Sequence, residues 1–348
     1  MRVSTLLLRD FRIHRAFDVR IGGHLLLVGP NGAGKTSILE GLHMLAVGRS
    51  FRRVPDEHLV RHGAALMEAV GDLAWSDGSH RVECRVAPAV GKRIHLDGRV
   101  VSRLGDLVEA TSVVTTSVDD VLLVEGSPWH ARRWLDLFAC QRERGLLALM
   151  VRYAQVLRQR NALLARGRDD PKAVAPGVLE PWSAQLFELG KEIEERRIAL
   201  VRAAERIVPA VYATLAGHEA DVRLVYEAGI RSDTLAGLRG VLQREVARGH
   251  SLWGPHRAGL EVTLNGASAR AFSSRGEKRS LAFAMKIAQG RLMRETPLCL
   301  IDDLALELDA RRSAEVVRLF MEVGQVVATS ARRESAWPEA LEVRNLDG

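Results

Sequence analysis

The stretch GPNGAGKT, residues 29–36, constrains the fold of this chain more than any other part of it. It fits the pattern G-x-x-x-x-G-K-[ST], in which glycines turn backbone N–H groups toward phosphates, the lysine reaches the outer phosphates and the hydroxyl serves Mg²⁺. The apolar run HLLLVG precedes it and the helical pattern KTSILEGLHML follows, so a chance glycine-rich turn is disfavoured. The expected nucleotide-binding residues are Gly29, Pro30, Asn31, Gly32, Ala33, Gly34, Lys35, Thr36 and Ser37.

Two adjacent carboxylates, Asp302 and Asp303, follow the apolar run PLCLI. A carboxylate at the tip of a buried strand beside the first one can hold Mg²⁺ through water, so we expect Thr36 and Asp302 to serve the metal. Asp303 can orient or deprotonate the attacking water, and Asp303 and Lys35 are the expected catalytic residues. The alternative is an ordinary strand with an acidic turn, which the phosphate loop elsewhere in the chain disfavours.

A serine-glycine turn in FSSRGEKRSLAFAMKIA opens another expected helix. Ser274 and the backbone of Gly276 would lie at the positive end of that helix, where an anion can bind. A plain helix cap also fits, because Ser274 with Glu277 three residues later forms the pattern of a capping box. The local sequence by itself favours the cap.

The rest of the chain alternates between strand-like and helical patterns. LLLRDFR and FDVRI predict strands with a turn at residues 13–16, and residues 65–96 predict antiparallel strands with a tight turn at HLDGR. Residues 128–215 predict long helices, which form an antiparallel arm around the break DDPKAVAPGVLEP. After residue 254 strands and helices alternate again, and GQVVATS is expected as the final strand.

The phosphate loop and Asp302 can meet only if the two ends of the chain join into one sheet. We therefore predict an α/β fold with a mixed sheet: an ATPase head built from residues 1–125 and 250–348, and an inserted helical lobe with its arm at residues 126–249.

Composition excludes several other classes of protein. The 348 residues contain no apolar run long enough to cross a membrane, and the first residues do not form a signal peptide. The three cysteines lie far apart without CxxC spacing, which indicates a reducing compartment and argues against a zinc module. We expect a cytoplasmic protein without a membrane partner.

The net charge of +7 is consistent with a polyanionic partner. Arginines gather in residues 132–168, where they could bind DNA phosphates or form a solvated helix face paired to the acidic second helix; the two alternatives stay open. A second candidate cluster is Arg49, Arg52 and Arg53. Few aromatics accompany these runs, so base stacking is not expected. The selected DNA-binding candidates are Arg132, Arg133, Arg158 and Arg160.

The combination of motifs resembles the ABC-type heads of the SMC, Rad50 and RecF ATPases, and details narrow the resemblance to the RecF family. GPNGAGKTSILEGLHMLAVGRSFR follows the family pattern beyond the phosphate loop. LVEGSPWHARRWLD, YAQVLRQRNALL, GPHRAGL, FSSRGEKRSLAFAMKIA, IDDLALELDARR and QVVATS then follow in the family's order. The resemblance covers essentially the whole chain.

The resemblance implies an ABC-type head that binds ATP and Mg²⁺, dimerises head to head on ATP and hydrolyses it slowly. It also implies DNA binding, a role in repair, replication restart and the SOS response, and work with RecO and RecR to place RecA at single-strand gaps. Carried over to this chain, Thr329 lies at the sensor strand end. The signature that closes over the partner subunit's nucleotide is Ser274, Arg275, Gly276 and Glu277.

Several positions depart from the family pattern. Glu277 replaces the usual Gln, where a carboxylate near a triphosphate is unfavourable unless it points away or is paired. Leu306 replaces a Ser, residues 118–120 read Val-Asp-Asp instead of Pro-Glu-Asp, and Ala258 and Gly259 replace acidic residues. These departures bear on the hydrolysis rate and dimer strength more than on nucleotide binding.

Three other functions remain to be weighed against this one. They are an SMC-like ATPase with another role such as phage defence, a nucleotide switch with negligible turnover, and the ATPase subunit of a membrane transporter. SSRGE in place of the transporter-type Leu-Ser-Gly-Gly-Gln and the arginine-rich lobe count against the transporter.

Overall fold

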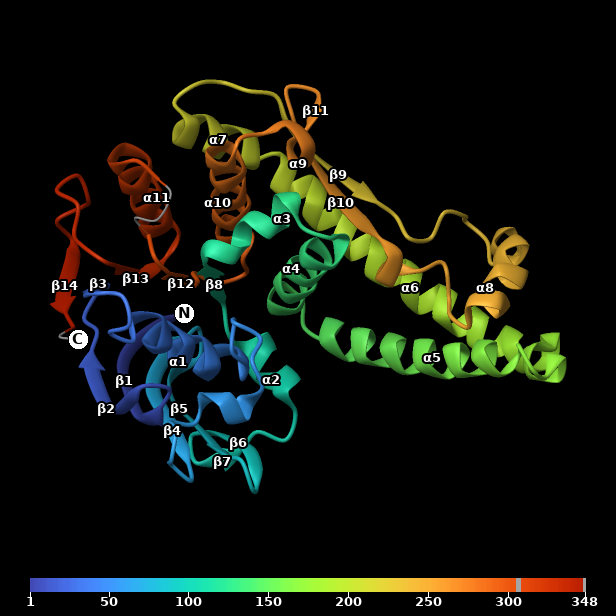
Figure 1. The fold of residues 1–348 in the computed structure, drawn as a ribbon, viewed down its shortest axis with the longest axis horizontal. Helices are drawn as coiled ribbons and strands as arrows, with labels where there is room; N and C mark the ends of the chain where they lie inside the picture. Colours follow the sequence, from blue (N-terminus) through green and yellow to red (C-terminus); the bar gives the residue numbers. More distant parts are fainter. Residues whose placement is uncertain (305–307, 347–348) are drawn as a thin grey trace. The chain divides into compact units, whose positions relative to one another are not determined.

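The computed structural model describes residues 1–304 and 308–346, so Leu306 lies outside the described residues. The chain forms two compact units, and Figure 1 shows its helices and strands. Unit 1 comprises Met1–Val121, Ile207–Ala220 and Ser273–Gly348, and unit 2 comprises Leu122–Arg206 and Asp221–Phe272.

The units differ from the expected lobes in residues 122–125, which belong to unit 2, and in two larger segments. Helix α7 (Val208–Ala216) belongs to unit 1 because it packs against α10 (Arg275–Leu292). Strand β10 (Gly259–Leu264) belongs to unit 2 because it pairs with β9 (Val222–Glu227). Packing partners, which the local sequence does not reveal, decide both assignments.

A parallel sheet in unit 1 joins the two ends of the chain. Its strand order is β14-β3-β13-β12-β8, and every neighbouring pair is parallel. The strands are β3 (His24–Val28), β8 (Val113–Thr116), β12 (Leu298–Ile301), β13 (Gln325–Ser330) and β14 (Leu341–Asn345). Residues 325–330 were expected to form the final strand, which is wrong: β14 follows and pairs with β3.

A second sheet in unit 1 is antiparallel, in the order β2-β1-β4-β5-β6-β7. The first turn lies at residues 12–13, earlier than the expected 13–16, because β2 already begins at His14. The expected tight turn at HLDGR is confirmed, with positive φ at Asp97 and Gly98. The strands are β1 (Arg2–Phe11), β2 (His14–Arg20), β4 (Met67–Trp75), β5 (Gly78–Ala87), β6 (Gly91–Leu96) and β7 (Arg99–Val100).

Helix α1 (Lys35–Val47) contacts strands of both sheets and is buried along almost its whole length. Its core position explains why its apolar residues are not confined to one face. Helix α10 packs on β8 and against α11 (Ala310–Val323), which in turn packs on β13. The remaining helices of unit 1 are α2 (Leu104–Ala110), η1 (Asp56–Leu59) and η2 (Val118–Val121).

Unit 2 is built on an antiparallel helix pair, as predicted. Arg160 of α5 (Leu146–Arg166) bonds to Ser183 of α6 (Pro176–Glu205), while Tyr153, earlier in α5, approaches Gly190, later in α6. Figure 1 shows the two helices side by side. The core of the unit combines residues of the pair with later ones: Tyr153, Val156, Leu186, Phe187, Leu189, Ile193, Ile230, Leu238 and Trp253.

The first long helical segment is two helices rather than one. Helix α4 (Pro128–Arg142) ends before Gly145, which has φ 83° and precedes α5. A small sheet, β11-β10-β9, completes the unit. The other elements are α3 (Leu122–Glu125), η3 (Pro171–Val174), η4 (Ala236–Val241), α8 (Leu242–Arg248), η5 (Pro255–Arg257), β11 (Ala267–Ser268) and α9 (Ala269–Phe272). Among the described residues, no helix has the length and apolar character that a membrane span requires.

Candidate nucleotide site

The phosphate loop connects β3 to α1, as the sequence predicts. Gly32 and Gly34 have φ values of 89° and 83°, a backbone region that favours glycine. A Cβ on Gly34 would also collide with the His14 ring, and one on Gly29 would lie 2.7 Å from the Leu346 carbonyl oxygen. The loop therefore needs glycine for its own conformation and for the chain segments packed around it.

The Lys35 side chain folds back over this loop. Its Nζ donates to the carbonyl oxygens of Gly29 at 2.7 Å and Pro30 at 2.8 Å, and the residue is only 8 % exposed. A lysine ammonium has three donors. The ammonium is thus held over the loop by backbone carbonyls, where it can reach a phosphate.

Asp302 lies at the centre of a hydrogen-bonded group that joins both ends of the chain. Thr36 Oγ1 and Thr329 Oγ1 each donate to Asp302 Oδ1 at 2.9 Å. Burial raises the pKa of Asp302, and the charge of Asp303 adds to this, while the two hydroxyls and the Arg52 charge oppose it. Parallel pairing of β12 with β13, and of β13 with β3, brings these residues together.

The oxygens of Thr36 and Asp302 fit a magnesium ion. Mg²⁺ prefers oxygen ligands, usually one or two carboxylates together with waters and substrate phosphates. A hydroxyl and a buried carboxylate 2.9 Å apart at the start of α1 provide that donor set. A dication there would also offset the burial of the Asp302 charge.

Thr329 also fixes the backbone of Asp303. The Asp303 amide donates to Thr329 Oγ1 at 2.8 Å, and the Leu304 amide donates to the Thr329 carbonyl at 2.9 Å. Asp303 has φ 54°, an uncommon value for a residue other than glycine. Thr329 is fully buried, and from the protein interior it holds the Asp302 carboxylate and the Asp303 backbone in place.

The capping box expected at Ser274 is present. The Ser274 hydroxyl accepts from the Glu277 amide at 3.3 Å, and the Glu277 carboxylate accepts from the Ser274 amide at 2.7 Å. These bonds with Ser274 lower the pKa of Glu277, and the charges of His218 and Arg312 act in the same direction. The Glu277 carboxylate is thus turned back onto the start of its own helix, with its charge partly balanced.

Two of the arginines that follow α1, Arg52 and Arg53, interact electrostatically with acidic residues of unit 1. The Arg52 charge acts on Asp302, as described above. Burial lowers the pKa of Arg53, and Asp119 and Asp120 oppose that shift. The sequence did not indicate that the Arg52 charge acts on the carboxylate at the nucleotide site.

A pocket of about 280 Å³ adjoins the phosphate loop and was not predicted. The Arg344 guanidinium lies over the Phe17 ring at 4.9 Å, and His14 Nε2 lies 3.1 Å from the Gly34 carbonyl oxygen. Nothing in the sequence connects these residues, because β2 and β14 come from opposite ends of the chain. The lining residues are Ile13, His14, Phe17, Gly32, Ala33, Arg344, Asn345 and Leu346.

The four DNA-binding candidates differ in accessibility. Arg160 is wrong as a phosphate contact, because it is 3 % exposed and bonds to Glu245 at 2.7 Å. Arg132 is half-buried and donates to the Ala258 carbonyl at 2.6 Å. Arg133 and Arg158 are exposed.

Together, the parallel sheet, the glycine loop at the end of β3 and the hydroxyl–carboxylate pair beside it define the class of this protein: a P-loop head of the ABC ATPase type. The fold agrees with solved structures. A structure of the recombination mediator protein RecF with ATP in the RecFOR pathway gives a TM-score of 0.85 at 22 % identity, covering 96 % of this chain and 92 % of that one. An Smc head bound to the C-terminal winged-helix domain of ScpA gives 0.62 at 16 % identity, covering 99 % of this chain and 93 % of that one.

The family follows from the sequence comparisons. The model of the RecF/RecN/SMC N terminal domain matches residues 2–337. The DNA replication and repair protein RecF of Synechococcus sp. (strain JA-2-3B'a(2-13)) is 30 % identical, over 100 % of this chain and 97 % of the relative. That of Frankia alni is 33 % identical, over 95 % and 93 %. The chain belongs to the RecF family of DNA replication and repair proteins.

Proposed function

We propose that this protein is an ATP-dependent switch on DNA, which binds Mg-ATP, dimerises on it and hydrolyses it slowly. The observation that carries the proposal is the hydrogen-bonded group of Thr36, Asp302 and Thr329 at the start of α1. If the glycine loop were only a turn, nothing would require this hydrogen-bonded group to lie beside it.

The two halves of the nucleotide have separate places in this proposal. The triphosphate lies over residues 29–37, with N–H groups of the loop and the Lys35 ammonium as donors. The pocket beside Gly32 and Ala33 receives the base, where the Arg344 guanidinium, which lies over the Phe17 ring, offers a planar surface. The pocket volume of about 280 Å³ suits one base.

Hydrolysis needs a water in line with the γ-phosphate. Bound Mg²⁺ supplies charge neutralisation for the phosphates, and Thr36 and Asp302 would hold it. Asp303 would orient or deprotonate the water, from a backbone position that Thr329 fixes. Lys35 would stabilise charge on the γ-phosphate.

The second half of the site comes from a partner subunit in this proposal. The Ser274 hydroxyl accepts the Glu277 amide, but its own proton remains available to a γ-phosphate. An 18-residue helix begins at this segment, and its positive end favours an anion; the segment consists of Ser274, Arg275, Gly276 and Glu277. The cap and the contact across the dimer are therefore compatible.

DNA binding would use backbone phosphates, with Arg133 and Arg158 as the accessible candidates. Relatives at 30 % and 33 % identity are named DNA replication and repair proteins, and a structural neighbour belongs to the RecFOR pathway. These similarities support a cytoplasmic role with RecO and RecR in placing RecA at single-strand gaps.

The proposal is tested by measuring mass and DNA affinity with and without a non-hydrolysable ATP analogue, on wild type and Lys35→Ala. We expect the analogue to convert wild-type monomer to dimer and to tighten binding to gapped DNA by at least tenfold. Lys35→Ala should stay monomeric at the same analogue concentration. Arg248→Ala, an exposed basic residue of unit 2, is the matched control and should behave as wild type.

If the analogue changes neither mass nor DNA affinity, the switch proposal fails. ATP turnover measured with the same proteins separates a slow hydrolase from a switch with negligible turnover. A rate indistinguishable from that of Lys35→Ala would support the second.

A further inference from the structure

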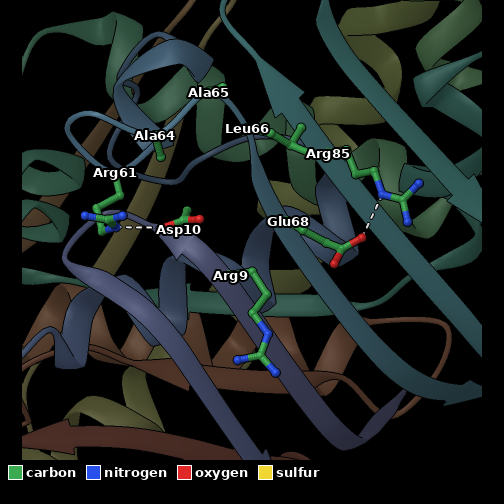
Figure 2. A pocket seen from close by; sticks show the side chains of 8 residues that line it. All are labelled: Arg9, Asp10, Arg61, Ala64, Ala65, Leu66, Glu68 and Arg85. Atoms are coloured by element: carbon green, nitrogen blue, oxygen red, sulfur yellow. Dashed lines mark hydrogen bonds and ion pairs between the residues drawn. The ribbon is translucent and has the colours of Figure 1, made fainter.

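A second pocket, of about 510 Å³, is lined by residues of the interior strands β1, β4 and β5 of the antiparallel sheet and by the loop before β4. Figure 2 shows Arg61 and Arg85 on opposite sides of it, with Arg9 between them in this view. Leu66 and two alanines form its apolar part. The lining residues are Arg9, Asp10, Arg61, Ala64, Ala65, Leu66, Glu68 and Arg85.

The loop that forms one wall of this pocket is fixed to β1. The Arg61 amide donates to the Asp10 carbonyl at 2.8 Å, and its side-chain Nε pairs with the Asp10 carboxylate at 2.6 Å. Phe11 and Val60 form an isolated β-bridge beside these bonds. The wall is therefore already built in the free protein, which lowers the entropy cost of binding a ligand.

The arginines of the pocket keep donors for a ligand. Arg61 uses Nε for the Asp10 carboxylate at 2.6 Å, which leaves its outer N–H groups for a ligand. Arg85 uses Nε for Glu68 at 2.7 Å and Nη2 for Glu83 at 3.4 Å, which leaves the N–H groups of Nη1. Arg9 is exposed and forms no ion pair within residues 1–304 and 308–346. Three guanidinium groups against two carboxylates give the lining a net positive charge.

The charges around the pocket disfavour duplex DNA as its ligand. The basic residues on the strands lie in one row across the sheet, where Arg9 faces Glu68, Glu68 faces Arg85 and Arg85 faces Arg93. The neighbouring row on the same face contains the carboxylates of Asp18 and Glu83. A duplex, with one charge per about 1.7 Å of its axis, would cover both rows and meet those carboxylates.

The apolar part of the pocket indicates the remaining chemistry of the ligand. Leu66 is 45 % exposed and stands beside the guanidinium groups, with Ala64 and Ala65 next to it in the chain. Phosphate alone would leave this surface uncovered. We propose that the pocket binds an acidic peptide segment of a partner protein, with carboxylates on Arg9, Arg61 and Arg85 and an apolar side chain on Leu66.

A fluorescein-labelled peptide, Ser-Gly-Asp-Glu-Asp-Leu-Phe-Gly, tests this proposal by anisotropy on the full chain at low salt. A second labelled peptide carries Asn-Gln-Asn in place of Asp-Glu-Asp. We expect the acidic peptide to bind at least tenfold more tightly than the amide peptide. Arg9→Gln should weaken it about tenfold, since a charged hydrogen bond is lost without breaking an internal ion pair. Leu66→Ser should weaken it by about fivefold.

Arg20→Gln is the matched control, because it removes the same charge from the same sheet face outside the pocket. It should change peptide binding by less than twofold. Equal binding of both peptides, or an unchanged affinity in Arg9→Gln, overturns the proposal. So does a parallel titration in which Arg9→Gln weakens a 30-base-pair duplex but not the peptide, because the pocket would then be a DNA contact. These readouts require no ATP, so they stand or fall separately from the proposed switch.

Discussion

Replacing Arg160 by methionine distinguishes a structural arginine from a DNA contact. The guanidinium donates Nε to Ser183 at 2.9 Å, and its other nitrogens bond to Glu245 and Ser251 at 2.7 to 3.0 Å. It also lies 4.9 Å over the Trp253 ring. Methionine keeps much of the side-chain volume and removes every one of these polar bonds.

The expected cost follows from what the substitution leaves behind. Glu245 is 1 % exposed and would lose its cation, while it would keep the hydrogen bond from the Leu252 amide. Breaking a buried ion pair by removing one partner typically costs about 3 to 5 kcal/mol. For a unit of this size that lowers the melting temperature by about 10 °C. Since Arg160 is 3 % exposed, we expect DNA affinity to stay within about twofold.

The assay is thermal unfolding beside DNA anisotropy at a temperature where both proteins are folded. The double variant with Glu245→Met should recover part of the lost stability, because two apolar side chains replace the ion pair. Arg158→Met, two residues away and exposed, should leave the melting temperature within about 2 °C. A normal melting temperature together with a tenfold loss of DNA affinity in Arg160→Met would refute this reasoning.

Two further predictions concern buried polar groups. Thr329→Val should reduce ATP hydrolysis at least tenfold and destabilise unit 1 by about 2 kcal/mol, because it removes a donor to Asp302 and an acceptor for the Asp303 amide. Thr329→Ser should retain both hydrogen bonds. Equal hydrolysis rates in the two variants would contradict this reasoning. Burial, with the charges of nearby arginines, lowers the pKa of His256 to about 4, below its ordinary 6.5. The unfolded chain therefore binds a proton between about pH 6.5 and 4 that the native state does not, so stability falls by up to about 3 kcal/mol as the pH drops through that window. Urea unfolding at pH 7 and pH 4.5 should show this loss in wild type and a smaller one in His256→Gln; equal losses would assign the effect to other groups.

The parts of the site that the sequence predicted have strong local signals. A glycine loop between an apolar run and a helix restricts the backbone to few arrangements, so its residues could be named before the structure. Asp302 was predictable because a carboxylate ends a buried strand. The hydrogen bond between Asp302 Oδ1 and Thr329 depends on the pairing of β12 with β13, and the sequence carries no local signal for that pairing.

The parts that were missed depend on chain segments far apart. Strand β14 is short and only partly buried, so its pattern is weak, yet it brings Arg344 to Phe17 at the phosphate loop. The charge pattern of α5 likewise could not show that Arg160 points toward Glu245, which lies 85 residues later. An arginine on an amphipathic helix looks the same in sequence whether solvent or another segment covers it.

The capping box at Ser274 leaves one question about the same hydroxyl, and a single substitution can answer it. Asp is as good a cap as Ser, because its carboxylate accepts the same amide, but it has no proton to donate and carries a charge that repels a phosphate. Ser274→Asp should therefore keep the melting temperature within about 2 °C of wild type and abolish the ATP-dependent dimer. Ser274→Ala should lose about 1 kcal/mol of stability through the missing cap. If Ser274→Asp dimerises on the ATP analogue like wild type, the hydroxyl is a cap only, and the γ-phosphate of the partner subunit is bound by other groups.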